Sequence, residues 1–431
     1  MKVTVMGLGY VGLVSSVALA DAGHDVVGLD INAERIKTLR NKQAPFYEPG
    51  MEAILKKGLE SGRLRFHAVG EDSVPLGEIV IIAVGTPSLP NGAADLAHVR
   101  SSIRWVAENA TEPITLVMKS TVPPGTGQQM LAQYLRETTS KIAYVSNPEF
   151  LREGNAMSDW FYPDRIVIGT QDTTALEQTK RLYSNIKAPV VATDVTTAEM
   201  IKYAANAFLA TKISFINEMA SLCDRIGGNI NDVEEGIALD PRIGPHFLKA
   251  GLGYGGSCFP KDVRGLEFIS TMHDHSFELM KAVISVNNRQ RMRPIQALKR
   301  VLGSLHGKAI SVLGLAFKPD TDDIREAPSI DIIGFLHAAG AIIKVYDPIV
   351  DTKGHAFLPK EVKIAASAQD AICGAEAVIL ATEWKEFVEG IDWPVVYQSM
   401  LPPRFIFDGR NALNAAALKA IGFHYQGVGR S

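Results

Sequence analysis

Residues 2–30 read KVTVMGLGYVGLVSSVALADAGHDVVGLD, and this stretch decides the fold of the N-terminal part of the chain. A short apolar run leads into three glycines with the spacing G-x-G-x-x-G, followed by a helical pattern and a second apolar run that ends in Asp30. The glycine motif alone is weak evidence, but the order strand, glycine turn, helix, strand and acid is typical of a dinucleotide-binding fold. The sequence therefore predicts an α/β domain with a Rossmann-like sheet.

The glycines and the residues between them form the expected cofactor turn. Gly7 permits a tight turn, and Gly12 lets the helix pack closely on the sheet. Gly9 leaves room for a pyrophosphate at the helix N-terminus, where Tyr10 and Val11 follow. We expect these five residues to bind the diphosphate of a dinucleotide.

Asp30 predicts which dinucleotide binds. Its carboxylate follows the last glycine at the interval at which an acid accepts hydrogen bonds from the adenosine ribose and repels a 2′-phosphate. Arg35 points the other way, because an arginine near the ribose can bind the extra phosphate of NADP. We predict NAD, with Asp30 and Arg35 both on the ribose side of the site.

Further strands are predicted at residues 64–67, 78–84, 114–118, 142–145, 164–169 and 190–193. The loops after three of them contain Thr86, Thr121, Glu149 and Glu153. Because the carboxyl ends of parallel strands meet at one edge of a sheet, we expect these loops to line the same crevice as the glycine turn. The plain alternatives are ordinary turn chemistry for Thr121 and a solvated loop for the two glutamates.

A helix of about 30 residues is predicted after these strands, a length that suits a connector between domains. Thr196-Thr-Ala-Glu199 has the pattern of a capping box, and no proline interrupts residues 198–225 before Gly227 and Gly228. The apolar stripe of this helix includes Ile201, Ala205, Phe208 and Phe215.

Lys202 and Asn206 stand four residues apart on this helix, so both lie on one face. A solvated lysine beside a polar neighbour is the alternative to a functional pair. Cys223, near the end of the helix, is expected to pack against other apolar side chains.

Cys258 lies in a glycine-rich loop, residues 251–262, that reads GLGYGGSCFPKD. Gly253, Gly255 and Gly256 permit backbone angles with positive φ and would let a ligand lie against the main chain. Lys261 favours a thiolate by its charge, and Asp262 adds a carboxylate that can hold a water or a proton. The loop therefore predicts a nucleophilic thiol, with a flexible hinge that carries an incidental cysteine as the alternative.

The last third of the chain contains a second strand, turn and helix. An apolar run at residues 308–314 leads into a turn with a single glycine of the fingerprint, a helical pattern at residues 324–339 and a strand at residues 342–346. Two more strands are predicted at residues 377–381 and 405–407, and Cys373 is expected to pack within this sheet. We predict three regions: residues 1–195, 196–300 and 301–431.

The amino-acid composition limits which classes of protein the chain can belong to. The 431 residues are 46% hydrophobic and carry a formal net charge of −3, without a concentrated basic surface, so neither nucleic acid nor membrane is an expected partner. Three cysteines and no Cys-x-x-Cys pair indicate a reducing compartment and no metal site. The N-terminus begins directly with a short strand and no run reaches the roughly 20 apolar residues of a membrane span, so we expect the cytoplasm.

With these motifs in order, the chain resembles the UDP-glucose and GDP-mannose dehydrogenase family over nearly its whole length. The motifs are the glycine turn, Gly85-Thr-Pro, Ser120-Thr-Val-Pro-Pro-Gly, Asn147-Pro-Glu-Phe-Leu-Arg-Glu-Gly, Lys202 with Asn206, Gly255-Gly-Ser-Cys-Phe-Pro-Lys-Asp and Gly314-Leu-Ala-Phe-Lys-Pro. The resemblance implies two Rossmann-like doubly wound domains, joined by a long central helix and a helical dimerisation region that builds a homodimer. It also implies NAD as the cofactor.

The resemblance implies two hydride transfers from C6 of a nucleotide sugar. Lys202 and Asn206 would stabilise the alkoxide, Cys258 would form a thiohemiacetal and then a thioester, and Glu149 would be the base for hydrolysis. Thr121 and Asp262 would position a water or balance charge.

The resemblance also assigns binding residues. For NAD it adds Thr86, Thr121, Glu153, Lys261 and Arg325 to Asp30, Arg35 and the glycine turn. For the nucleotide sugar it implies Glu149, Phe150, Leu151, Arg152, Glu153, Lys202, Asn206, Phe247, Leu248, Lys249, Ala250, Gly251, Gly255 and Lys318, with Arg242 from the partner subunit. Residues 247–251 favour UDP-glucose, while GDP-mannose and UDP-N-acetylmannosamine remain alternatives. Two rival classes are a two-electron hydroxyacid dehydrogenase, which needs no thiol, and an NAD-binding sensor without turnover.

Overall fold

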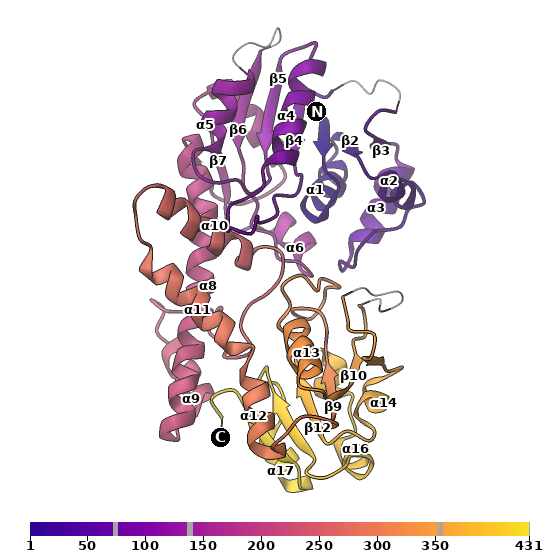
Figure 1. Cartoon of the computed structure of the whole chain (residues 1–431). Helices are drawn as coiled ribbons and strands as arrows, with labels where there is room; N and C mark the ends of the chain where they lie inside the picture. Colours follow the sequence, from indigo (N-terminus) through magenta and orange to yellow (C-terminus); the bar gives the residue numbers. More distant parts are fainter. Residues whose placement is uncertain (72–75, 136–140, 351, 353–356, 431) are drawn as a thin grey trace. The chain divides into compact units, whose positions relative to one another are not determined.

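The computed structural model describes residues 1–71, 76–135, 141–350, 352 and 357–430. It divides into two compact units, Met1–Ala205 and Asn206–Ser431, and each has its own β-sheet and hydrophobic core (Figure 1). The division falls inside the long helix α8 (Val195–Ile226). Two Rossmann-like domains and a long central helix confirm the predicted fold class, whereas the three predicted region boundaries stay a prediction.

The N-terminal unit alternates strands and helices. Before α8 its elements are β1 (Lys2–Met6), α1 (Tyr10–Asp21), β2 (Asp25–Asp30), α2 (Ala33–Arg40), α3 (Met51–Glu60), β3 (Leu64–Ala68), β4 (Ile79–Ile82), α4 (Ala97–Asn109), β5 (Ile114–Met118), α5 (Thr126–Met130), the π-helix η1 (Leu131–Leu135), β6 (Ile142–Ser146), α6 (Ala156–Phe161), β7 (Ile166–Gly169), α7 (Thr173–Leu182) and β8 (Val190–Thr193). The sheet order is β3-β2-β1-β4-β5-β6-β7-β8, parallel except where β6 meets β7.

The central strands β4 and β5 of this sheet are buried on both faces. In β4 every residue is buried, and Ile79 and Ile81 pack in one hydrophobic cluster while Val80 and Ile82 pack in another. Alternate side chains of a strand point to opposite faces, so the sheet separates two cores. The strand order reverses between β1 and β4, and ligands of doubly wound sheets bind at such a switch point.

The C-terminal unit contains a helical region followed by a second sheet. Its elements after α8 are α9 (Ile230–Ala238), α10 (Phe259–Met272), α11 (Glu278–Gln290), α12 (Arg293–Leu302), β9 (Ala309–Leu313), α13 (Pro328–Ala338), β10 (Ile342–Tyr346), β11 (Lys363–Ile364), α14 (Ala368–Ile372), β12 (Ala377–Leu380), α15 (Lys385–Glu389), α16 (Trp393–Ser399), β13 (Phe405–Asp408), α17 (Ala415–Ile421) and β14 (His424–Gly427). The parallel sheet has the order β11-β10-β9-β12-β13-β14, which is that of a dinucleotide-binding fold.

The predicted capping box at the start of α8 is wrong. The helix begins at Val195, and Asp194 provides the cap, because its carboxylate accepts from Thr197 N at 2.9 Å. The Thr196 hydroxyl is buried and has no hydrogen-bond partner among the described residues. The Glu199 carboxylate instead accepts from Gly125 N at 2.7 Å and Gly127 N at 2.9 Å.

The structure confirms the expected packing of Cys223 and contradicts that of Cys373. Cys223 is buried in the core of the C-terminal unit, as predicted. Cys373 is exposed, so the expectation that it packs is wrong; it follows the last residue of α14 as the C-cap, outside the sheet.

No helix within the described residues is long and apolar enough to cross a membrane. The cytoplasmic location stays a prediction.

Candidate active site

The glycine turn between β1 and α1 has the geometry that a dinucleotide requires. Gly7 has φ +88°, and a Cβ on Gly12 would stand 1.8 Å from the carbonyl oxygen of Gly7. By contrast, a Cβ on Gly9 would meet nothing within 4 Å, so the backbone at the start of α1 is open to a pyrophosphate. The turn therefore fits the phosphates of a dinucleotide, and Tyr10 and Val11 form the first residues of α1.

Asp30 is a buried carboxylate at the end of β2. It accepts from Leu8 N at 2.7 Å, from Asn32 N at 2.8 Å and from the Arg35 guanidinium at 2.9 Å. The bond to Leu8 ties the carboxylate to the glycine turn. Asp30 and Arg35 thus lie together, and a negative and a positive group are both present where the sequence expected the ribose.

The loops after β4 and β5 meet, as predicted. The Thr86 hydroxyl donates to the carbonyl oxygen of Thr121 at 2.9 Å, and Ser120 Oγ donates to the carbonyl oxygen of Val84 at 2.7 Å. Two hydroxyl-bearing residues are therefore fixed at the carboxyl edge of the sheet.

Glu149 and Lys202 form a buried ion pair within the N-terminal unit. Lys202 Nζ lies 3.1 Å from Glu149 Oε1, and the two side chains are 4% and 5% exposed, respectively. Glu149 Oε2 accepts from Leu151 N at 2.5 Å, and Lys202 Nζ also lies 5.3 Å from the ring centroid of Phe150. The structure thus brings together three residues that the sequence assigned to one site.

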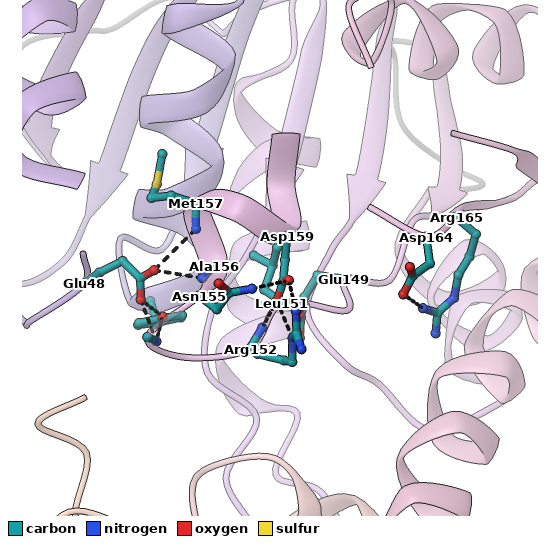
Figure 2. Close-up of polar contacts among 12 residues, drawn as sticks. Glu48, Glu149, Leu151, Arg152, Asn155, Ala156, Met157, Asp159, Asp164 and Arg165 are labelled. Carbon is teal, nitrogen blue, oxygen red and sulfur yellow. Dashed lines mark hydrogen bonds and ion pairs between the residues drawn. The ribbon is translucent and has the colours of Figure 1, made fainter. Parts of the chain in front are cut away.

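Asp159 of α6 holds Arg152 in the loop after β6 (Figure 2). Asp159 accepts from the backbone N of Arg152 at 2.8 Å and from its guanidinium at 2.6 Å. Glu153 is buried, and Gly154 has φ +77°, a conformation that favours glycine. Arg152 is engaged with Asp159, so in this conformation its guanidinium is turned toward α6.

In the C-terminal unit, Asp262 connects α10 to α8. Its carboxylate is 1% exposed and accepts from Asn206 Nδ2 at 2.6 Å, while Lys261 Nζ lies 2.5 Å from its other oxygen. Asp262 stands four residues after Cys258, so it lies one helical turn beyond the thiol. Lys261 is therefore paired with this carboxylate.

Cys258 is the N-cap residue of α10, and its side chain is half-buried. The positive end of a helix favours a thiolate over a thiol. Ser257 Oγ lies 3.6 Å from its Sγ. The position suits a reactive cysteine rather than a packed one.

The glycines before Cys258 are needed for two different reasons. Gly253 and Gly256 have φ of +93° and +81°, the left-handed region that the sequence predicted. Gly255 is needed because a Cβ there would lie 2.4 Å from the carbonyl oxygen of Glu326. Asn287 holds the loop from α11, since its Oδ1 accepts from Tyr254 N at 2.8 Å.

The segment before this loop presents few side chains for substrate. Leu248 and Ala250 are buried in the core of the C-terminal unit, so only their backbone groups remain for a ligand. Phe247 adopts φ +62° and packs its ring 5.9 Å from that of Phe259. Lys249 is exposed. Gly251 N donates to Asn217 Oδ1 at 2.8 Å, which fixes the end of the segment.

Three predicted basic residues have contacts within the C-terminal unit. The Arg242 side chain is 88% exposed and pairs with Asp240 at 2.6 Å. Arg325 pairs with Asp323 at 2.8 Å, and Lys318 Nζ lies 5.7 Å from the ring centroid of Phe317.

Sequence reasoning missed several residues that hold these loops. Arg165 stacks 3.6 Å from the centroid of Phe150, and Figure 2 shows its ion pair with Asp164. Asn217 and Asn287 are buried amides on helices, and a buried amide must have a hydrogen-bond partner. That rule could have indicated that both asparagines bind another group, although it could not have predicted which loop they bind.

A dinucleotide turn, a buried lysine beside a carboxylate and a thiol at a helix N-terminus define the chain as a pyridine-nucleotide-dependent oxidoreductase. Family models for the UDP-glucose/GDP-mannose dehydrogenase family match three segments: the NAD binding domain at residues 1–187, the central domain at residues 196–289 and the UDP binding domain at residues 311–415. The chain therefore belongs to the UDP-glucose/GDP-mannose dehydrogenase family. It is an NAD-dependent nucleotide-sugar dehydrogenase, which confirms the predicted cofactor and class of enzyme.

Curated relatives and solved structures match the whole chain. It is 43% identical to UDP-glucose 6-dehydrogenase YwqF of Bacillus subtilis, covering 100% of this chain and 98% of that protein, and 42% identical to UDP-glucose 6-dehydrogenase of Rhizobium meliloti, covering 100% of both. A UDP-glucose dehydrogenase structure from Pyrobaculum islandicum is 39% identical with a TM-score of 0.93, covering 100% and 98%. A UDP-D-ManNAc dehydrogenase structure from Pyrococcus horikoshii is 30% identical with a TM-score of 0.88, covering 100% and 99%.

Proposed function

We propose that the chain oxidises UDP-glucose at C6 to UDP-glucuronate by removing four electrons, through a thiohemiacetal and a thioester on Cys258. The observation that carries the proposal is the half-buried thiol at the N-terminus of α10, one turn before the buried Asp262. A two-electron hydroxyacid dehydrogenase needs no such thiol. Relatives named UDP-glucose 6-dehydrogenase share 40–43% identity with the chain, against 30% for the UDP-D-ManNAc dehydrogenase, which favours UDP-glucose over the N-acetylated sugar.

The first oxidation releases the hydroxyl proton to solvent water and removes one hydride from C6. Each of the two hydrides would be taken up by its own bound NAD, so the first NADH would leave and a second NAD would bind before the second oxidation. Lys202 and Asn206 stand one turn apart on α8 and stabilise the developing alkoxide, Lys202 by charge and Asn206 as a donor. Loss of one such oxyanion partner typically raises the barrier by about 2.7–4 kcal/mol.

The second oxidation needs a nucleophile, because an aldehyde does not readily give up hydride. The Cys258 thiolate adds to the aldehyde carbon, and the resulting alkoxide takes up a proton to give a thiohemiacetal. That hydroxyl then releases its proton to solvent water as the remaining C6 hydrogen leaves as hydride. The product is a thioester between C6 and Sγ.

Water hydrolyses the thioester with Glu149 as the base. Glu149 removes a proton from the water as its oxygen attacks C6, and the Cys258 thiolate leaves, so the carboxylic acid is released and the enzyme is restored. Glu149 is suited to this role because its carboxylate is held in place by Leu151 N and by the Lys202 ammonium group. Thr121 and Asp262 position the water or balance charge in this proposal.

The binding residues expected from the family complete the proposal. Asp30, Arg35, Thr86, Thr121, Glu153, Lys261 and Arg325 contact NAD together with the glycine turn. The nucleotide sugar is held by Phe150, Leu151, Arg152, Phe247, Leu248, Lys249, Ala250, Gly251, Gly255 and Lys318. Because the side chains of Leu248 and Ala250 are buried, these two residues contact the sugar nucleotide through their backbone groups in this proposal.

An exposed apolar face on α8 supports the proposal of a homodimer. Phe208, Phe215 and Leu222 follow one another at intervals of seven residues and are 66%, 51% and 48% exposed, and Ile226 nearby is 71% exposed. Apolar side chains repeated every seven residues are typical of helices that pack against one another. Arg242, beyond the end of α9, extends into the partner's site in this proposal.

The substrate is tested by steady-state rates with UDP-glucose, GDP-mannose and UDP-N-acetylmannosamine, together with the NADH formed per sugar consumed. We expect the highest kcat/KM with UDP-glucose and two NADH per sugar. One NADH per sugar would support the hydroxyacid-type reaction, and a clear preference for another sugar would reject UDP-glucose. Sedimentation velocity of Phe208→Ser/Phe215→Ser should show a monomer, and an unchanged dimer would reject this interface.

A further inference from the structure

Glu48 is a buried carboxylate that the proposed chemistry does not use. It lies between α2 and α3 and is 6% exposed. Its Oε2 accepts from the Tyr10 hydroxyl and from Gly154 N at 2.7 Å, and its Oε1 accepts from Ala156 N at 2.8 Å and Met157 N at 3.3 Å. Figure 2 shows the carboxylate between these backbone groups of α6 and the loop before it. Four donors converge on this side chain, and the three backbone donors lie more than 100 residues from it in the sequence.

The network ties two parts of the site together. Tyr10 is the first residue of α1 and belongs to the glycine turn that fits the dinucleotide phosphates. Its hydroxyl donates to Glu48 and accepts from Gly154 N at 2.8 Å, so it bridges the turn and the loop. Phe46, two residues before Glu48, packs its ring 4.9 Å from that of Tyr10.

The donors and acceptors of this hydrogen-bond network have fixed roles. Burial, followed by the hydrogen bond to Glu48, raises the pKa of Tyr10 well above its ordinary value, so the phenol stays protonated and remains a donor. Three of the four donors to Glu48 are backbone N–H groups that cannot reverse direction. Glu48 is therefore an acceptor at both oxygens.

The loop that Glu48 holds carries groups of the site. Residues 147–154 include Glu149 and Glu153, and the next residue, Asn155, is the N-cap of α6 but makes no side-chain hydrogen bond to the first backbone N–H groups of the helix; its Nδ2 donates to Asp159 Oδ1 at 2.7 Å instead. The Glu48 carboxylate provides that missing cap from another part of the chain. The loop's far end is held separately, since Asn147 Nδ2 donates to the carbonyl oxygen of Val167 at 2.7 Å.

We propose that Glu48 is a positioning residue that couples the glycine turn, through Tyr10, to the loop bearing Glu149 and Glu153. Binding of NAD at the turn then orders the loop, and loss of the carboxylate uncouples the two. The catalytic consequence rests on the proposed role of Glu149 in hydrolysis, whereas the coupling itself does not.

Hydrogen–deuterium exchange of the full chain with and without NAD tests the coupling. We expect NAD to slow exchange at residues 147–157 in the wild type, and this protection to disappear in Glu48→Gln at NAD concentrations that saturate the variant. An amide cannot replace the carboxylate, because backbone donors face both oxygens and the NH₂ group would oppose one of them. Tyr10→Phe removes the bridge while leaving Glu48 and Ala156 in place, and it should lose the protection as well.

The control is Leu55→Ala, which removes a fully buried side chain of α3 that makes no bond in this network. It destabilises the same unit and should keep the NAD-dependent protection. Loss of protection in this control, or its retention in Glu48→Gln and Tyr10→Phe, would reject the coupling and leave Glu48 a structural cap only. If Glu48→Gln does not fold, Tyr10→Phe alone decides.

Steady-state kinetics provide the second readout. Glu48→Gln should lower kcat about tenfold, since a displacement of about 1 Å at a reacting group costs up to a hundredfold. Tyr10→Phe should lower kcat less, and the double variant should be no slower than Glu48→Gln, because both act through one network. Multiplicative losses would contradict a shared network. The exchange experiment needs neither Cys258 nor sugar, so the coupling can hold even if the thioester route fails.

Discussion

The buried pair of Lys202 and Glu149 allows a quantitative prediction for Lys202→Met. At 3.1 Å and an effective dielectric constant of about 20, the attraction is about 5 kcal/mol, and it is opposed by the cost of burying both charges. Methionine removes the attraction and leaves the carboxylate of Glu149 buried, and such unpaired charges typically cost about 3–5 kcal/mol.

We expect Lys202→Met to lower the free energy of unfolding by about 3–5 kcal/mol at pH 7, because it leaves one member of a buried ion pair without its partner. Urea unfolding followed by tryptophan fluorescence measures this, and Trp105 and Trp160 both lie in the N-terminal unit.

The matched control is Lys202→Met/Glu149→Gln, which leaves no charge at the pair and retains an acceptor for Leu151 N. Its stability should exceed that of Lys202→Met at pH 7, while both variants stay inactive. A single variant as stable as the wild type, or a double variant no more stable than the single one, would refute the reasoning.

Three further predictions follow from other residues. Cys258→Ser should form no thioester and give at most one NADH per UDP-glucose, measured by absorbance and product analysis; undiminished acid production would contradict the covalent step. Asp30→Ser should raise the ratio of kcat/KM for NADP to that for NAD by about tenfold or more, because Arg35 is then free of its carboxylate; an unchanged ratio would be the contrary result. Burial raises the pKa of Glu199 to about 7, so its contribution to stability is complete below pH 4.5 and is lost as the pH rises through about 7. Glu199→Gln should therefore flatten the unfolding free energy over that range, and an unchanged pH profile would exclude this group.

The sequence predicted the sheets well because most of their strands are short apolar runs. Strands at Lys2–Met6, Ile114–Met118, Val190–Thr193 and Ile342–Tyr346 are confirmed to the residue. Ile114–Met118 is buried at every position, as expected of a strand covered on both faces, whereas Val190–Thr193 is mostly exposed at the edge of its sheet and was recognised from its apolar residues alone. The helix predicted from residue 324 begins only at Pro328, which occupies its first turn as proline prefers.

Side-chain partners were less predictable because they join distant parts of the chain. Thr196 and Glu199 have the spacing of a capping box, but Glu199 binds backbone groups more than 70 residues away and Asp194 supplies the cap. The sequence from Thr196 to Glu199 is compatible with either set of hydrogen bonds, and tertiary packing determined which set forms. Glu48 was missed for the same reason, because no residue near it in the sequence indicates that its carboxylate binds the backbone N–H groups of residues 154–157.

A comparison of the two sheets explains why two similar folds need not bind the same nucleotide. Asp30 ends β2 and Asp347 follows β10, and each accepts from the backbone N of the residue after the first glycine of its turn, Leu8 or Leu315. The Asp347 oxygen that faces the turn also accepts from Ala316 N and from the Trp384 indole at 3.1 Å. That indole is 7% exposed, whereas the corresponding oxygen of Asp30 accepts from the more exposed Arg35 guanidinium at 2.9 Å. In the second turn the buried Trp384 indole therefore fixes Asp347 in a structural role. A ligand of this unit would be held by other groups, which is consistent with the match to the UDP binding domain of the family.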